Sequence, residues 1–225
     1  KTVTIPPRKD ASRTGGAIGI GVVLLALLAK FKTVLLVLLN FKWIAIGLKV
    51  LLSSGTMLAS IWAWSLLYGW SFATGFVLLI LVHELGHVAA LRAYGMKSSL
   101  PMFIPFIGAF VAHKEQAPSP KASALISLAG PAVGGLGALA CFITGMYTGS
   151  PYWFALASLA FVINLFNLLP FGPLDGGHIA GALHSMNDPS MSAQRAQVLW
   201  STIAVAAVLF VLWLAAGHAL AAAPR

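Results

Sequence analysis

Charge is scarce in this sequence. Charged residues make up 8% of its 225 residues and hydrophobic residues 59%, whereas about a quarter of the residues of an ordinary soluble domain are charged. The apolar residues form long uncharged blocks, which is the pattern of membrane-spanning helices. The lack of charge therefore excludes an ordinary soluble domain and predicts one polytopic membrane protein.

Cysteine is also nearly absent. Cys141 is the single cysteine, so no disulfide can form within the chain, and its apolar surroundings suit a small buried side chain. The formal net charge is +9, but no basic groove with interleaved aromatic residues accompanies it. We therefore expect no nucleic-acid partner. In a membrane protein, excess Lys and Arg set orientation and contact anionic lipids.

Acidic side chains number five, and their positions are informative. They are Asp10, Glu84, Glu115, Asp175 and Asp188. An ionisable group at membrane depth costs roughly 2.5–3.5 kcal/mol, so it indicates a functional site. Glu84 lies within an apolar block, and Asp175 alone among the others follows a long apolar run.

Glu84 belongs to the motif His83-Glu84-x-x-His87. Residues four apart share one face of a helix, so both imidazoles can reach one ion, with Glu84 beside it as a non-ligand. With six His and two Glu in the chain, this motif arises by chance on the order of once per thousand such sequences. A catalytic zinc site takes three protein ligands and keeps one position open. We expect one Zn²⁺ per chain on His83, His87 and Asp175.

The chain divides into four parts by composition. Residues 1–14 form a flexible basic tail, 15–49 an N-terminal membrane or interfacial segment, 50–180 a catalytic membrane core, and 181–225 a polar connection followed by a C-terminal transmembrane helix. Lys30 and Lys32 split Gly15–Phe41 into short apolar pieces, so one tilted helix, a hairpin and an interfacial helix all remain open. No cleavage motif follows Ala29, so we expect no cleaved signal peptide.

Long uncharged blocks predict the spans of an all-α polytopic membrane protein with about six transmembrane helices. Beyond the N-terminal segment, we expect spans at Val50–Tyr68, Ser71–Leu91, Ala122–Gly145, Pro151–Leu169 and Ala196–Gly217, and a polar connection at Gly181–Arg195. With Lys42 and Lys49 on the cytoplasmic side, every core Lys and Arg falls on that side, as the positive-inside rule requires. The same threading places the three expected ligands at one level, near the cytoplasmic ends of their segments.

Prolines forbid a continuous helix between Lys97 and Lys121. Within this region, Leu100–His113 is rich in strand-forming residues, and backbone at membrane depth must be satisfied inside the protein or line a wet cavity. We therefore expect a short re-entrant β-hairpin or strand near Leu100–His113. Such an edge could hold an unwound peptide segment by strand addition, with substrate contacts at Phe106, Gly108, Ala109 and Phe110.

HELGH on one span and N-x-x-P-x-x-x-L-D-G-G at Asn167–Gly177 on a later one resemble the site-2 protease family of intramembrane zinc metalloproteases. The resemblance covers most of Trp70–Ile179 and implies a three-helix catalytic core that cleaves membrane-embedded segments of anchored, regulatory proteins. It implies Glu84 as catalytic base and Asn167 as a residue that positions or polarises the substrate. Asn167 could instead form a helix–helix hydrogen bond, which Asn164 could equally provide.

Two further expectations complete the sequence-based hypothesis. No connection is long enough for an inserted PDZ domain of about 80–100 residues, and no CBS-type regulatory domain follows the core, so we expect a compact family member. We expect a multi-pass protein of a bacterial inner membrane, with the active site near the cytoplasmic side. The rival hypothesis is a catalytically silent membrane protein that binds metal or helices. It is disfavoured because neither the glutamate nor a ligand is missing from the motifs.

Overall fold

The computed structural model describes residues 26–32, 41–113 and 115–223. The predicted tail and most of the predicted N-terminal segment lie outside these ranges. The chain divides into two units, Lys1–Val50 and Leu51–Arg225, and the second contains the expected site. The elements are α2 (Phe41–Tyr68), α3 (Trp70–Ala93), β1 (Met102–Ile104), β2 (Gly108–Phe110), α4 (Pro120–Thr148), α5 (Pro151–Asn167), α6 (Asp175–Ser185), η1 (Pro189–Met191) and α7 (Ser192–Ala222).

Helices dominate the described residues, as the sequence predicted. Four are long and apolar enough to cross a membrane, namely Ile44–Tyr68, Trp70–Ala93, Pro120–Thr148 and Pro189–Ala222. The apolar helix α5 is shorter, at 17 residues. The prediction of a helical polytopic membrane protein is confirmed, with these four long helices and α5 in the described part where about six spans were expected.

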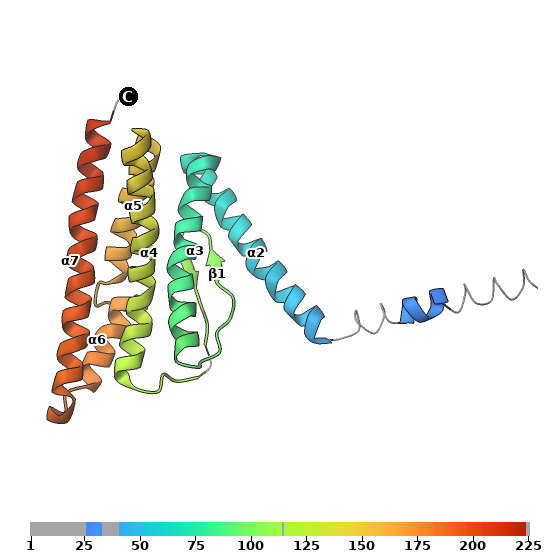
Figure 1. The fold of residues 1–225 in the computed structure, drawn as a ribbon, viewed down its shortest axis with the longest axis horizontal. Helices are drawn as coiled ribbons and strands as arrows, with labels where there is room; N and C mark the ends of the chain where they lie inside the picture. The colour runs from blue at the N-terminus through green and yellow to red at the C-terminus, as the bar shows by residue number, and fades with distance from the viewer. Residues whose placement is uncertain (1–25, 33–40, 114, 224–225) are drawn as a thin grey trace, which may run out of the picture. The chain divides into compact units, whose positions relative to one another are not determined.

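Helix α4 is the centre of the second unit. It packs against α3, α5, α6 and α7, and Figure 1 shows it between α3 and α7. Ser119 caps its first turn by accepting a hydrogen bond from the Ala122 amide, and Pro120 occupies the first turn, as is typical of helix starts. Small residues dominate where α4 meets its neighbours, which allows the backbones to approach closely.

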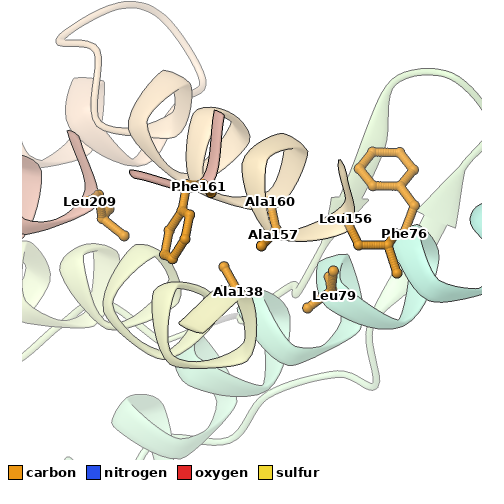
Figure 2. Packing of buried hydrophobic residues seen from close by; sticks show 9 residues of the cluster. Phe76, Leu79, Ala138, Leu156, Ala157, Ala160, Phe161 and Leu209 are labelled. Atoms are coloured by element: carbon orange, nitrogen blue, oxygen red, sulfur yellow. The ribbon is translucent and has the colours of Figure 1, made fainter. Parts of the chain in front are cut away.

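A buried apolar cluster joins four of these helices. Its largest fully buried side chain is Phe161, and four alanines belong to the same cluster. Figure 2 shows Phe76 and Leu79 of α3, Ala138 of α4, Leu156, Ala157, Ala160 and Phe161 of α5, and Leu209 of α7. This packing fixes α5 against α3 and α4, and thereby positions the polar residues near the end of α5.

The predicted hairpin is present. Strands β1 and β2 pair antiparallel, with Met102 opposite Phe110, Phe103 opposite Ala109 and Ile104 opposite Gly108. The turn closes with a hydrogen bond from the Ile107 amide to the Ile104 carbonyl. Phe106 in this turn has a φ of 63°, a conformation that usually selects glycine. Phe103 anchors the hairpin in a buried cluster with Ile61, Ala73 and Val77.

Helix α6 differs from the sequence-based expectation of a polar connection across Gly181–Arg195. The chain is helical from Asp175 to Ser185, and α7 begins at Ser192, four residues before the predicted start. The reason is tertiary packing, because Ile179, Ala182 and Met186 are buried against residues of α4 and α7. The glycines of α6 weaken its intrinsic helix propensity, but burial of this apolar face compensates.

Candidate metal centre

Helix α3 presents both histidines of the motif on one face. His83 is 7% exposed, and its ring centroid lies 4.9 Å from that of His87. The two Nε2 atoms are 3.1 Å apart. The spacing of four residues thus brings both imidazole nitrogens to one point, as helical geometry predicts.

Asp175 reaches the same point from α6. Its Oδ2 lies 3.2 Å from His83 Nε2, and its Oδ1 lies 3.2 Å from His87 Nε2. One ligand atom from each of the three residues lies within 4.8 Å of the others. Asp175 is the first residue of α6, where the helix dipole also favours a carboxylate.

The loop before α6 is folded tightly and determines where Asp175 lies. Within it, the Phe171 amide donates to the Leu169 carbonyl and the Leu174 amide to the Phe171 carbonyl. A Cβ at residue 176 would overlap the Leu168 backbone. Glycine is therefore required next to Asp175, because only a backbone without a side chain can approach the loop so closely.

Hydrogen bonds on the far side of each ring hold the histidines. His87 Nδ1 lies 2.9 Å from the Ile126 carbonyl oxygen, which can only accept, so Nδ1 donates. His83 Nδ1 lies 2.8 Å from Asn164 Oδ1. In a neutral imidazole whose Nδ1 carries the proton, Nε2 keeps its lone pair. Both lone pairs therefore face Asp175.

This donor set fits a zinc ion. Asp175 Oδ2 is buried and accepts no hydrogen bond among the described residues, although it lies near His83 Nε2. Two nitrogen lone pairs and a carboxylate thus converge with no proton donor between them. Buried acceptor atoms that face one another without a donor or a cation cost free energy. Two His and one carboxylate are common zinc ligands. The residues present fit the metal.

Glu84 lies beside this group and is 5% exposed. Its carboxylate interacts electrostatically with His83, His87 and Asp175, and it makes no hydrogen bond with any residue that the structure describes. A buried carboxylate in a cluster of ionisable side chains is a candidate functional residue.

The two asparagines of α5 lie in different surroundings. Asn167 is the residue expected to position or polarise the substrate. It is half-buried, and its side chain makes no hydrogen bond within the described part of the chain. Asn164 is buried at 3% exposure and contacts His83. Sequence reasoning gave Asn164 only a packing role. Its presence in an otherwise apolar span was the available signal.

Helix α4 shapes the site without supplying a ligand. A Cβ at Gly130 would overlap His87 Nε2 and lie 2.8 Å from His83 Nε2. The space that this glycine leaves open is therefore the space beside the converging nitrogens. The four residues expected to bind substrate, Phe106, Gly108, Ala109 and Phe110, lie on the hairpin, whose strand β2 contacts α3.

Comparisons with known proteins identify a peptidase family. The family model described as Peptidase family M50 matches residues 71–151 and 148–211. The "Putative zinc metalloprotease Rip3" of Mycobacterium tuberculosis is 36% identical over 124 residues, covering 49% of this chain and 30% of the relative. Zinc metalloprotease MJ0392 of Methanocaldococcus jannaschii is 32% identical over 119 residues, covering 49% of this chain and 34% of the relative.

The aligned region thus spans about a third of the length of these curated relatives. Among solved structures, the site-2 protease from Methanocaldococcus jannaschii matches with a TM-score of 0.45 at 22% identity, covering 73% of this chain and 86% of that one.

Proposed function

Because the chain belongs to peptidase family M50, the family of the site-2 proteases, we propose that it is an intramembrane zinc metalloprotease. Its substrates are peptide bonds within or next to transmembrane segments of membrane-anchored regulatory proteins. One observation carries this proposal. His83, His87 and Asp175 converge beside the buried Glu84, in a chain whose described helices include four long enough to cross a membrane.

His83, His87 and Asp175 would hold the metal. When bound, zinc supplies Lewis acidity for the scissile carbonyl and lowers the pKa of a water molecule towards about 7. The imidazole orientations support this role because the Ile126 carbonyl and Asn164 occupy both Nδ1 atoms. Each Nε2 therefore remains available as a ligand.

Glu84 is the proposed general base. It adjoins His83 in the sequence and is not one of the three converging ligands. Its carboxylate takes the proton of the attacking water and delivers it to the leaving amine. Asn167 is the proposed substrate-positioning residue, because its amide has no hydrogen-bond partner in the described part of the chain and can donate to a substrate carbonyl.

The hairpin is proposed to hold the substrate as an added strand. The Phe103 amide donates to Thr56 Oγ1 at 3.2 Å, and Ser53 Oγ donates to the Pro101 carbonyl at 2.6 Å. Residues of α2 therefore cover the outer edge of β1. Because Phe103 and Ala109 are paired and the Phe103 amide points away from β2, the Ala109 amide points away from β1. No described residue bonds to it, so the β2 edge can accept a peptide.

The proposed location is a bacterial inner membrane with the site near the cytoplasmic side. Arg92 lies at the end of α3, Lys121 at the start of α4 and Arg195 in the first turn of α7. Those ends of α3, α4 and α7 lie at the same end of the second unit as α6 (Figure 1). Basic residues concentrate on the cytoplasmic side of membrane proteins.

The test compares wild type with Glu84→Gln on a transmembrane peptide in liposomes, with zinc measured on the same samples. We expect the variant to keep its zinc and to lose about 10²–10⁴-fold in turnover, because the amide cannot accept the proton. Equal turnover would exclude Glu84 as the base. A zinc-loaded wild type that binds the peptide without cleaving it would support the silent binding protein instead.

A further inference from the structure

Behind His83 lies a chain of contacts that reaches into α5. We propose that Asn164 is a positioning residue for the metal centre, which fixes the proton of His83 on Nδ1 and so directs the Nε2 lone pair towards Asp175. This inference rests on the proposed zinc site and adds to it a residue outside both sequence motifs.

The orientation of the Asn164 amide follows from its second contact. Asn164 Nδ2 lies 2.7 Å from the Ala160 carbonyl oxygen. A carbonyl oxygen only accepts, so the nitrogen of the amide must face Ala160 and the oxygen must face His83. That oxygen can only accept, and it lies 2.8 Å from His83 Nδ1. The proton of neutral His83 is therefore on Nδ1.

Close packing prevents the amide from turning away. Asn164 is 3% exposed, and a Cβ at Gly134 would overlap Asn164 Oδ1 and lie 2.9 Å from Nδ2. The amide therefore fills the space that Gly134 leaves on α4. The α4 backbone therefore closes this side of the amide.

The two histidines are held differently, which makes the inference testable. His87 depends on the Ile126 carbonyl, a backbone group of α4 that no substitution removes. His83 depends on a side chain. Residues that hold the outer nitrogen of a histidine ligand typically contribute 10–100-fold to metal affinity.

A purely structural role predicts a different response. If Asn164 only packs α5 against α3 and α4, the apolar and nearly isosteric Asn164→Leu should be tolerated, whereas Asn164→Asp would bury a charge. If Asn164 positions His83, Asn164→Asp keeps an acceptor for Nδ1, and Asn164→Leu removes it. The two hypotheses therefore predict opposite orders of zinc affinity for Asn164→Leu and Asn164→Asp.

The experiment titrates zinc against a competing chelator, using the full chain in detergent. We expect Asn164→Leu to bind zinc 10–100-fold more weakly than wild type, and Asn164→Asp to stay closer to wild type than Asn164→Leu. Asn167→Leu is the matched control and should keep wild-type zinc affinity. Wild-type affinity in Asn164→Leu, or weaker binding by Asn164→Asp than by Asn164→Leu, would overturn the inference.

A double-mutant cycle covers the case in which Asn164→Leu does not fold. Gly134→Ala should displace the amide and weaken zinc binding in an otherwise wild-type chain. In an Asn164→Ala background the added methyl occupies vacated space, so the second change should cost no further affinity. Equal, additive losses in both backgrounds would show that Gly134 does not act through Asn164 and would overturn the inference.

Failure of the inference differs from failure of the proposed function. A wild type that binds no zinc, or a His83→Ala/His87→Ala variant that binds it fully, contradicts the zinc site itself. Zinc binding that depends on both histidines but not on Asn164 contradicts only the role of Asn164.

Discussion

At the scale of single residues, Gly130 shows how a metal centre can depend on a missing side chain. The position where its Cβ would lie overlaps His87 Nε2 and is 2.8 Å from His83 Nε2. A methyl group there would compete for space with the ligand atoms. The sequence predicts only close helix packing at Gly130, because the role of a glycine depends on what faces it.

We therefore predict that Gly130→Ala abolishes tight zinc binding. The loss should exceed the roughly 10–100-fold range expected when an indirect support of a ligand is removed. Gly181→Ala is the control, since nothing lies within 4 Å of a Cβ at that position. Chelator competition on both purified variants is the measurement. Tight binding by Gly130→Ala would show that α4 does not limit the space around the histidines.

The sequence predicted three residues that the structure brings together, but not all of their neighbours. His83 and His87 follow from helical periodicity, and Asp175 from the scarcity of carboxylates. The distinction between Asn164 and Asn167 depends on how α5 is rotated against α3, and Asn164 is the one that reaches His83. Tertiary packing sets the rotation of α5. That rotation cannot be read from a sequence in which both asparagines lie in one apolar block.

At the scale of elements, the hairpin has two unequal edges. Hydroxyl groups of Ser53 and Thr56 cover the outer edge of β1, whereas the outward Ala109 amide of β2 has no partner among the described residues. An uncovered strand edge is a template for another strand. This asymmetry allows the substrate-holding hypothesis to be tested at one backbone amide.

We predict that Ala109→Pro lowers cleavage of a transmembrane peptide while zinc content stays unchanged. Proline removes the outward amide, and one backbone hydrogen bond contributes about 0.5–1.5 kcal/mol, which corresponds to roughly 2- to 10-fold in rate. Ala109→Ser keeps the amide and serves as the control. Equal cleavage by Ala109→Pro and wild type would remove the strand-addition hypothesis.

The sequence predicted the helices that long uncharged blocks specify, and it missed the helix that tertiary packing stabilises. The spans that became α3, α4, α5 and α7 were predicted from uncharged blocks, and their ends agree with the structure within a few residues. Helix α6 was not predicted, because Gly176, Gly177 and Gly181 weaken any local helix signal. Packing of its apolar face against α4 and α7 stabilises it. Such a contact between distant segments cannot be recognised from the local sequence.

At the scale of the whole molecule, the basic residues and the candidate metal centre lie towards the same end. His87 is six residues before the end of α3 at Ala93, a distance of about 9 Å along the helix. A hydrocarbon core is about 30 Å thick. We therefore propose that the centre lies within the membrane, in the half nearer the basic end.

We predict that this basic end faces the cytoplasm. In a Cys141→Ser background, Thr148→Cys near the α4–α5 turn should react with a membrane-impermeant maleimide on intact cells. Asn187→Cys, between α6 and α7, should react only after the membrane is permeabilised. Both positions are exposed, so burial does not separate them. The opposite labelling pattern would contradict the orientation.

The separation of the three proposed ligands along the chain has a consequence for biosynthesis. His83 and His87 enter the membrane together on α3, but Asp175 follows only after α4 and α5. At about 5–20 residues per second, a ribosome needs roughly 5 to 20 s to synthesise the intervening segment. During that interval the unfinished chain has both histidines and Glu84 but lacks the third ligand. Under the proposed function, the nascent chain is thus inactive during the interval in which its own spans are not yet packed together.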